Sequence, residues 1–259
     1  MAERIAIPEN FPDVGDVTGK RVVLTGASRG LGELIAHGFS RAGAKVALVA
    51  RTERDLKEVA DRLPGPVLQF AGDVRDAEFN EAVADATVSA WGGVDVWIGN
   101  AGVSPIVAGP RETDPHVWRQ VLDVNLTGAF LGARAAARVM GEGGRLIFTG
   151  SVLGERPARG LSAYSASKAG LVGMAKALAL DLAPAGITVN VVAPGWFDSP
   201  LAAGWKQNDR LAQAILGHTA LRRWGGSTDL TGAFRFLASD AAAFVTGAVL
   251  SVDGGYLLT

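Results

Sequence analysis

The feature that most constrains the fold is an alternation between short apolar runs and longer stretches with helical periodicity. The apolar runs occupy residues 21–24, 45–49, 67–70, 94–98, 145–148, 188–192 and 248–252. Helical periodicity covers residues 31–42, 53–63, 76–91, 113–140, 162–183 and 227–238. Continuous apolar runs are typical of strands that are buried on both faces of a parallel sheet. The alternation therefore predicts a doubly wound α/β fold, with a seven-stranded parallel sheet and helices on both faces.

One domain is expected over residues 20–259, after an N-terminal leader at residues 1–19. The chain has 259 residues, 48% of them hydrophobic, which suffices for one large core. No linker, repeat or low-complexity segment interrupts the alternation. The leader mixes acids with Pro8 and Pro12 and lacks the apolar centre of a signal peptide. We expect it to be irregular, and either packed on the surface or used at an oligomer contact.

Charge and composition limit the classes of partner that the protein is expected to bind. The net charge is −1 with no block of like charges, which disfavours a nucleic-acid or anionic-membrane surface. There is no cysteine, and the three histidines are dispersed, so we expect no metal site. No apolar stretch reaches the roughly 20 residues that span a bilayer. These features predict a cytoplasmic protein that acts on a small molecule.

A glycine-rich turn follows the first apolar run. The residues expected to bind a cofactor here are Thr25, Gly26, Ser28, Arg29, Gly30, Leu31 and Gly32. Glycines permit a tight turn and close approach to a diphosphate, and the N-terminus of the next helix favours negative charge. The spacing is Gly-x-x-x-Gly-x-Gly rather than the commoner Gly-x-Gly-x-x-Gly. A plain turn is the alternative, but the place after the first strand favours a dinucleotide and a Rossmann-type fold.

Tyr164 and Lys168 stand four residues apart in a helical pattern, so their side chains share one helix face. A nearby cation lowers the pKa of a phenol, which is ordinarily about 10, and prepares it to give and take a proton. Ser151 follows the apolar run 145–148. One alternative is a lysine that merely lies over the ring. Another is a Ser165-x-x-Lys168 nucleophile, but its Ser-Asp-Asn and Lys-Thr-Gly partners do not occur.

The glycine turn, Ser151 and Tyr164-x-x-x-Lys168 together resemble the short-chain dehydrogenase/reductase family, from about Lys20 to the C-terminus. The resemblance implies hydride transfer between a nicotinamide cofactor and a carbonyl or secondary alcohol. Its catalytic set would be Asn125, Ser151, Tyr164 and Lys168. Tyr164 would act as general acid/base, Ser151 would bind the same oxygen, and Lys168 would also hold the nicotinamide ribose. Asn125 would order a proton-relay water, which is compatible with the other interpretation, an amide satisfied within the core.

The same resemblance extends the cofactor site along the chain. Besides Tyr164 and Lys168, the residues that it implies are Asp73, Val74, Asn100, Ala101, Gly102, Pro194, Gly195 and Ser199. Asp73 would lie against the adenine, although a plain turn aspartate fits the sequence nearly as well. Gly99 departs mildly from the family's Asn-Asn-Ala-Gly. Residues 196–218 are interpreted as a substrate lid, with an ordinary packed excursion as the alternative.

The residues at the end of the second apolar run indicate whether the cofactor carries a 2′-phosphate on its adenosine ribose. NAD enzymes generally carry an acid at its end, but this chain has Ala50 followed by Arg51, with Arg29 in the glycine turn. Two guanidinium groups suit a 2′-phosphate, so NADP(H) is expected unless Arg51 is only a solvated charge.

Several alternatives stay open. They are an NAD(H)-dependent sugar or polyol dehydrogenase, a non-catalytic NADP(H)-binding subunit, and a dehydratase or epimerase. The resemblance is shared among 3-oxoacyl-acyl-carrier-protein reductases, sugar and polyol dehydrogenases and xenobiotic carbonyl reductases, so the substrate stays unidentified. Arg156 and Arg159 lie between Ser151 and Tyr164 in the sequence, so they should border the substrate pocket. There they could attract an acidic substrate or simply be solvated. Apolar surface on residues 113–140 and 162–183 predicts a homo-oligomer, and the resemblance implies a tetramer.

Overall fold

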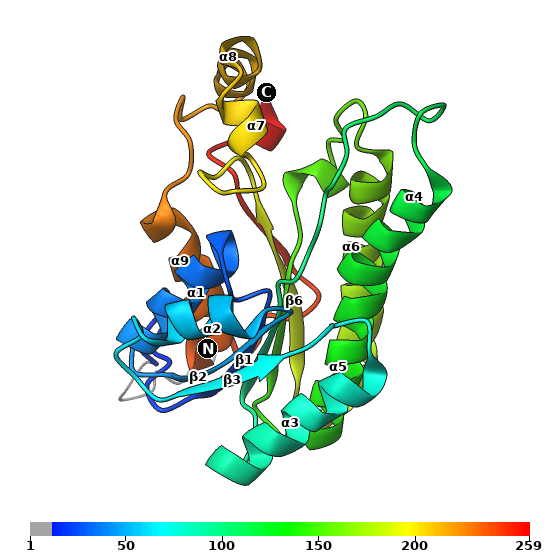
Figure 1. Cartoon of the computed structure of the whole chain (residues 1–259). Coiled ribbons are helices and arrows are strands. Elements are labelled where there is room, and N and C mark those ends of the chain that lie inside the picture. Colours follow the sequence, from blue (N-terminus) through cyan, green and yellow to red (C-terminus); the bar gives the residue numbers. More distant parts are fainter. Residues whose placement is uncertain (1–11) are drawn as a thin grey trace, which may run out of the picture.

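Seven parallel strands form one sheet in the order β3-β2-β1-β4-β5-β6-β7 (Figure 1). The computed structural model describes residues 12–259. The strands are β1 Arg21–Thr25, β2 Lys45–Ala50, β3 Val67–Ala71, β4 Val96–Gly99, β5 Arg145–Thr149, β6 Thr188–Pro194 and β7 Val249–Val252. The order reverses between β1 and β4, as in a doubly wound fold. The predicted fold class is confirmed.

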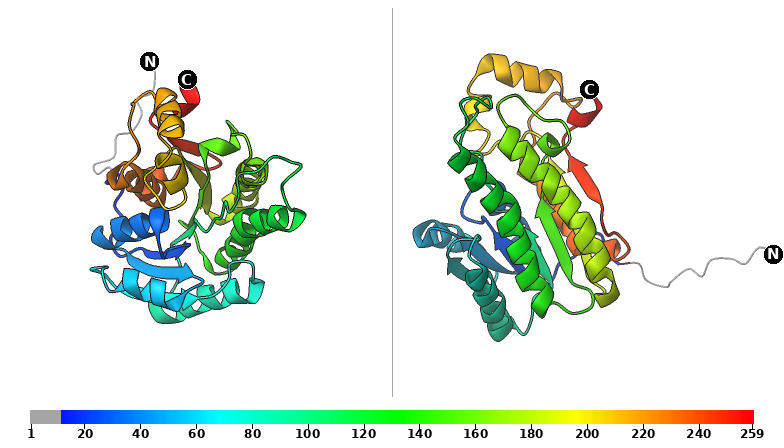
Figure 2. Two further views of the ribbon diagram at one scale, coloured as in Figure 1. Left: turned by 45° about the horizontal axis from the view of Figure 1, so that its top comes forward. Right: turned by 90° about the vertical axis from the view of Figure 1, so that its right-hand side faces the viewer.

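Helices cover both faces of the sheet (Figure 2). They are α1 Gly30–Arg41, α2 Glu53–Ala60, α3 Ala77–Trp91, α4 Pro115–Leu122, α5 Gly128–Val139, α6 Ser162–Leu182, α7 Ala203–Lys206, α8 Asp209–Gly217 and α9 Ser227–Ala238. The apolar residues of α1, α2 and α9 join one buried cluster, which includes Phe39 and Phe234. Those of α3, α5 and α6 join a second cluster around Trp97 and Phe148. Two separate cores thus hold the sheet from its two sides.

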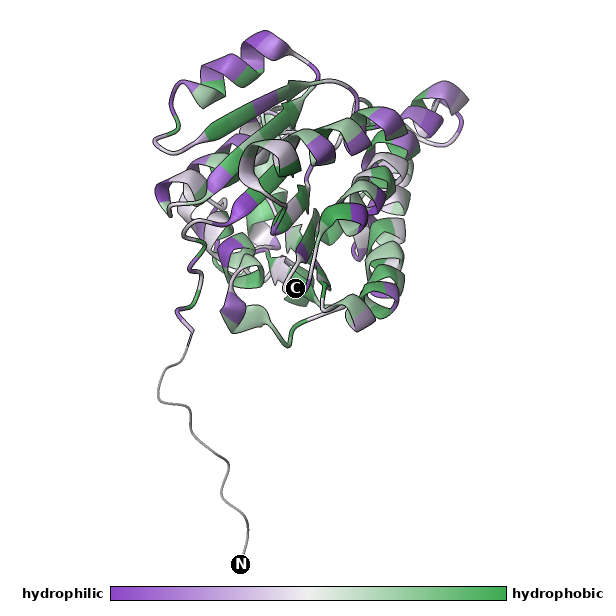
Figure 3. Ribbon diagram, turned by 90° about the horizontal axis from the view of Figure 1, so that it is seen from below, coloured by the Kyte–Doolittle hydropathy of each residue, from purple (hydrophilic) through white to green (hydrophobic). Residues whose placement is uncertain are grey.

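The burial of each strand follows its place in the sheet. Every residue of β5 and β6 is buried, which explains why their sequences are mostly apolar. The edge strands β3 and β7 alternate exposed with half-buried positions. Figure 3 shows hydrophobic residues along the strands and hydrophilic ones on the outer sides of the helices. No helix within residues 12–259 is long and apolar enough to cross a bilayer.

The stretch 113–140 is more elaborate than the single helix expected there. A π-helical turn, Asp123–Thr127, separates α4 from α5 without breaking the helical path. The start of α4 is fixed by Asp114, whose carboxylate accepts a 2.7 Å hydrogen bond from the backbone N–H of His116. Isolated π-helical turns are frequent at functional sites. Here the turn contains Asn125, which is buried.

Part of the leader belongs to the core. Within residues 12–19, Val17 is fully buried in the cluster formed with α1 and α9. Arg235 of α9 also donates a 3.0 Å hydrogen bond to the Gly15 carbonyl. The described part of the leader is therefore packed on the domain, and residues 1–11 lie outside the described residues.

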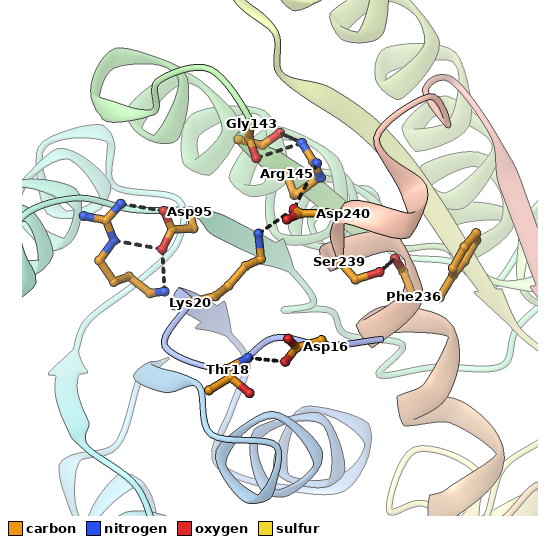
Figure 4. Close-up of polar contacts among 11 residues, drawn as sticks. Asp16, Thr18, Lys20, Asp95, Gly143, Arg145, Phe236, Ser239 and Asp240 are labelled. Carbon is orange, nitrogen blue, oxygen red and sulfur yellow. Dashed lines mark hydrogen bonds and ion pairs between the residues drawn. The ribbon is translucent and has the colours of Figure 1, made fainter. Parts of the chain in front are cut away.

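Ion pairs connect the N-terminal ends of the central strands (Figure 4). These ends lie opposite to the ends that the glycine turn follows. Arg21 at the start of β1 donates to Asp95, which precedes β4, through its backbone N–H at 2.7 Å and its Nε at 2.8 Å. Lys20 pairs with Asp240 at 2.9 Å. The contacts of Arg21 with Asp95 hold the start of β1 beside the start of β4, and these two strands bound the crevice at their other ends.

Candidate active site

A cleft of about 440 Å³ opens at the carboxyl ends of the strands, next to the point where the strand order reverses. Ligands of open α/β sheets bind at this place. The cleft is lined by the glycine turn, by the segments after β2, β3, β4 and β5, by α6, and by the segment after β6. The residues that line the cleft therefore come from many segments, between Gly26 and Trp205.

The backbone of the glycine turn packs too closely against its neighbours to admit a side chain at two positions. Gly26 has a φ of +67°, and a Cβ there would lie 2.8 Å from the Cα of Ala101. A Cβ on Gly32 would lie 2.0 Å from the carbonyl oxygen of Gly26. Helix α1 starts without a side-chain cap from Arg29. Its first N–H groups therefore remain available to an anion, so the turn fits a diphosphate.

Thr25 is the predicted cofactor residue that does not line the cleft. It is buried, and its Oγ1 accepts hydrogen bonds from the backbone N–H groups of Asn100 at 3.0 Å and Ala101 at 3.1 Å. The Asn100 side chain in turn donates to the carbonyls of Thr25 at 2.9 Å and Gly26 at 3.2 Å. Thr25 thus fastens the glycine turn to the end of β4 and does not face a ligand.

The other predicted cofactor residues all line the cleft. They are Gly26, Ser28, Arg29, Gly30, Leu31, Gly32, Arg51, Asp73, Val74, Asn100, Ala101, Gly102, Tyr164, Lys168, Pro194, Gly195 and Ser199. Ala50, at the end of β2, lines it as well. The residues that the sequence predicts to bind the cofactor therefore lie together on the surface of this cleft.

Three of the four predicted catalytic residues meet at the cleft. Tyr164 and Lys168 lie one turn apart on α6, and Ser151 follows β5. The Nζ atom of Lys168 lies 5.7 Å from the centre of the Tyr164 ring and donates a 2.7 Å hydrogen bond to the Thr149 carbonyl. Ser151 forms a hydrogen bond with Tyr164. A hydroxyl pair that can hold one substrate oxygen is thus set beside a buried cation.

The pKa values of this group differ from what the spacing predicts. Burial raises the pKa of Tyr164, and the hydrogen bond with Ser151 offsets only part of that rise. Burial also lowers the pKa of Lys168 to about 8. The expectation that Lys168 brings the Tyr164 pKa down is therefore wrong for the protein alone. The physical reason is that desolvation dominates, while the Lys168 ammonium is directed to the Thr149 carbonyl.

Asn125 lies behind the cleft. Its Oδ1 accepts a 2.8 Å hydrogen bond from the Val103 N–H, and its Nδ2 donates to the Val103 carbonyl at 3.0 Å and to Ser167 Oγ at 3.1 Å. Ser167 Oγ donates at 2.6 Å to the Tyr164 carbonyl. The amide therefore joins the segment after β4 to the helix that carries Tyr164. These contacts favour the interpretation of an amide satisfied within the core.

The far end of the cleft carries the two arginines considered for the phosphate. Arg29 and Arg51 both line it, and both side chains are exposed. Arg75 also lines it, and its guanidinium pairs with Asp73 at 2.7 Å. The hydrogen bond from Arg75 is the main cause that lowers the pKa of Asp73, with a contribution from Arg51. No sequence pattern marks Arg75 as a cleft residue, because only the turn after β3 directs it there.

Near Tyr164, most of the lining is apolar. Val103, Val107, Leu153 and Leu161 contribute without having been predicted, whereas Trp196, Leu201 and Trp205 come from the segment that the sequence predicts as a lid. Helix α8 of that segment does not line the cleft, and neither do Arg156 and Arg159. Hydrophobic residues in connecting segments carry no distinctive pattern, so nothing in the sequence marks them as lining. No cluster of three possible metal ligands occurs within residues 12–259.

The fold and the site define a doubly wound α/β enzyme with a glycine-rich first turn. A family model described as enoyl-(acyl carrier protein) reductase matches residues 26–257. The 3-oxoacyl-[acyl-carrier-protein] reductase FabG of Escherichia coli is 36% identical over 239 residues, which cover 92% of this chain and 97% of that protein. The chain therefore belongs to the short-chain dehydrogenase/reductase family. It is an oxidoreductase of alcohol or carbonyl substrates.

Solved structures agree with this assignment. A short-chain type dehydrogenase/reductase from Mycobacterium marinum is 34% identical and superposes with a TM-score of 0.88, over 95% of this chain and 99% of that one. A short chain dehydrogenase from Burkholderia cenocepacia, in complex with NADP, is 32% identical with a TM-score of 0.86, over 93% and 99% of the two chains.

Proposed function

We propose that the protein is an NADP(H)-dependent enzyme that interconverts a ketone and a secondary alcohol. The observation that carries this proposal is that Ser151, Tyr164 and Lys168 line the same cleft as a glycine turn and an uncapped helix N-terminus. When bound, the nicotinamide cofactor supplies the hydride. The glycine turn and the start of α1 would hold its diphosphate, and the residues after β6 would border its nicotinamide.

The chain's own residues would bind the substrate oxygen and donate a proton to it. Because burial raises the Tyr164 pKa, the phenol stays protonated at neutral pH and can donate to an oxygen that gains negative charge. Ser151, hydrogen bonded to Tyr164, supplies a second donor to that oxygen. Lys168 lies one turn further along α6, with its Nζ 5.7 Å from the centre of the Tyr164 ring, and would hold the nicotinamide ribose. In the oxidative direction, Tyr164 would have to act as the base, which needs a higher pH.

Two exposed arginines support NADP(H) over NAD(H). Arg29 and Arg51 line the cleft at the ends of β1 and β2, and Ala50 stands where an acid would bind a free 2′-hydroxyl. Guanidinium groups suit a phosphate in both charge and forked geometry. The NADP complex of the Burkholderia cenocepacia relative adds support.

Isotope transfer tests the chemistry. NADPH deuterated at the reactive nicotinamide carbon is incubated with a ketone, and the alcohol is analysed by mass spectrometry. We expect deuterium on the carbinol carbon from one of the two labelled faces. A product formed without label from either face, or without net cofactor oxidation, would support a dehydratase or epimerase instead.

Comparison of kcat/KM for the two cofactors tests the phosphate site. A preference for NADPH of about 10–1,000-fold is expected, because two charge-assisted contacts contribute but are screened at an exposed site. Arg51→Ala should weaken the use of NADPH and leave NADH use unchanged, whereas Ala50→Asp should favour NADH. Arg54→Ala is the matched control, because Arg54 is 82% exposed and does not line the cleft. Equal use of both cofactors by the unmodified protein would refute the assignment.

We also propose a homotetramer, working in the cytoplasm. Phe130 of α5 is 45% exposed and Leu180 of α6 is 80% exposed, which leaves apolar surface on the two helices that the sequence singles out. The number four rests on the family alone. Light scattering should give a particle of about four times the 26.8 kDa chain mass. A monomer at micromolar concentration would contradict this assembly.

A further inference from the structure

We infer that the substrate is a ketone or secondary alcohol whose body is apolar and uncharged, such as an aromatic or alicyclic ring. This inference rests on the proposed function and narrows it. It follows from the distribution of charge and of apolar surface along the cleft. Sugar and polyol substrates, and substrates with a negative charge close to the carbonyl, do not suit that distribution.

The charged side chains that line the cleft gather at one end. Arg29, Arg51, Asp73 and Arg75 follow β1, β2 and β3, where the cofactor's adenosine is expected. Lys168 is the other charged lining residue, and its ammonium is directed to the Thr149 carbonyl. Beyond Tyr164 the cleft therefore offers a substrate no free ionic partner among the described residues.

The walls beyond Tyr164 form a hydrophobic cluster. Val152, Leu153 and Leu161 are buried there together with Tyr256, and Tyr164 packs against them. Two further members, Trp196 and Trp205, pack with ring centres 5.4 Å apart and line the cleft. Aromatic and aliphatic walls of this kind stabilise a bound apolar ring by removing it from water.

Two cations of the surrounding segments, Arg156 and Lys206, have other partners. Arg156 donates to the Tyr256 carbonyl at 2.8 Å and to the Thr259 carbonyl, and its guanidinium lies 5.1 Å from the centre of the Tyr256 ring. Lys206 pairs with Asp198 at 2.5 Å. Neither cation lines the cleft. An anionic substrate would therefore be desolvated against apolar walls without a compensating charge.

A hydroxylated substrate meets a similar difficulty. Apart from Ser151 and Tyr164, which bind the reacting oxygen, this part of the lining has the hydroxyls of Ser104 after β4 and of Ser199 after β6, and Ser199 is expected at the nicotinamide. Gln120 of α4 adds one amide, and it is exposed. Sites that discriminate in favour of hydroxyl groups pair them with specific donors and acceptors. A polyhydroxylated ring would leave several buried hydroxyls unpaired, which costs binding free energy.

Two matched pairs of ketones test this inference, with NADPH oxidation as the readout. Cyclohexanone is compared with a pentahydroxycyclohexanone, and acetophenone with its anionic analogue para-acetylbenzoate. The apolar member of each pair should have the higher kcat/KM, by about 10–100-fold. If the hydroxylated or the anionic member is used as well or better, the substrate class is wrong and the hydride-transfer function stands. If NADPH binds but none of the four ketones is reduced, the proposed function and this inference both fail.

Removing one wall of the cleft should weaken the apolar preference selectively. Trp205→Ala should lower kcat/KM for acetophenone by about 10-fold or more and change that for acetone much less, because only the larger ketone reaches the wall. Trp224→Ala is the matched control, since Trp224 packs against Trp196 at 6.0 Å but does not line the cleft. Equal losses for both ketones in Trp205→Ala would show that the ring is not a substrate wall.

Adding a charge should reverse the discrimination. Val107 lines the cleft and is 56% exposed, so Val107→Lys can be accommodated at the rim. We expect this variant to use para-acetylbenzoate better relative to acetophenone, with the ratio of the two kcat/KM values increased by about 5-fold or more. Val14→Lys, at a position 76% exposed and away from the cleft, should leave that ratio unchanged. An unchanged ratio in Val107→Lys would overturn the assignment of this end of the cleft to the substrate.

Discussion

Replacing Asn125 with alanine is expected to lower the free energy of unfolding by about 2–4 kcal/mol. The side chain is buried in the π-helical turn, and it exchanges two hydrogen bonds with the backbone of Val103. Alanine leaves the Val103 N–H and carbonyl without these partners. Ser167 loses less, because its hydroxyl still donates to the Tyr164 carbonyl.

The magnitude follows from the two backbone groups that lose their partners. An unsatisfied buried donor or acceptor costs about 1–3 kcal/mol. Val103 is only partly buried, so water can reach its backbone in part, and the lower half of that range applies to each group. Two groups at about 1–2 kcal/mol each give the stated total. The segment that borders the cleft after β4 loosens at the same time, so KM should rise more than kcat falls.

Urea unfolding of three proteins tests this reasoning. The parent, Asn125→Ala and Ser167→Ala are compared by the midpoint, with the slope of the transition held as a check on its two-state character. Ser167→Ala removes one of the three contacts of the amide and should cost about 0.5–1.5 kcal/mol. If Asn125→Ala unfolds within about 0.5 kcal/mol of the parent, the amide is not a structural tie.

Three further predictions concern the pair on α6. Tyr164→Phe should leave NADPH affinity nearly intact and lower turnover by about 10²–10⁴, the range for a general acid, and activity within a few-fold of the parent would refute its role. Burial lowers the Lys168 pKa to about 8 from 10.5, so the unfolded chain binds more protons between those values. The free energy of unfolding should therefore rise with pH across that window in the parent and not in Lys168→Met, as measured by urea midpoints. Because burial raises the Tyr164 pKa, ketone reduction should be insensitive to pH near neutrality while alcohol oxidation increases toward alkaline pH. A reductive rate that falls as pH passes through neutrality would contradict this protonation state.

The sheet was predictable because each of its central strands is buried on both faces. That burial demands continuous apolar runs, and these mark β1, β2, β5 and β6 in the sequence to within two residues of their ends. The π-helical turn was not predictable. Asn125 within this turn is hydrogen bonded to Val103, which lies in another segment. Helical periodicity is nearly the same on both sides of the turn, so the pattern predicts one continuous helix.

The site was predictable where spacing alone sets the geometry. A helix brings Tyr164 and Lys168 to one face, and a tight turn needs Gly26 and Gly32. The direction of the Tyr164 pKa shift was not predictable, because it depends on burial by residues that are remote in the chain. Remote contacts also explain why Thr25, which the glycine-turn pattern includes among the ligand contacts, does not line the cleft. Its partners at the end of β4 are 75 residues away.

The adjacency of β1 and β4 has a consequence for biosynthesis. The bonds that close the crevice span about 75 residues, and bringing such distant ends together costs roughly 4 kcal/mol of loop entropy. During synthesis β1 and β2 emerge before β4, so one edge of β1, with the apolar sequence Val22–Leu24, stays unpaired until later residues arrive. An unpaired apolar edge is a template for aggregation. The nascent chain is therefore most vulnerable between the emergence of β2 and that of β4, and this interval is where a chaperone would protect it.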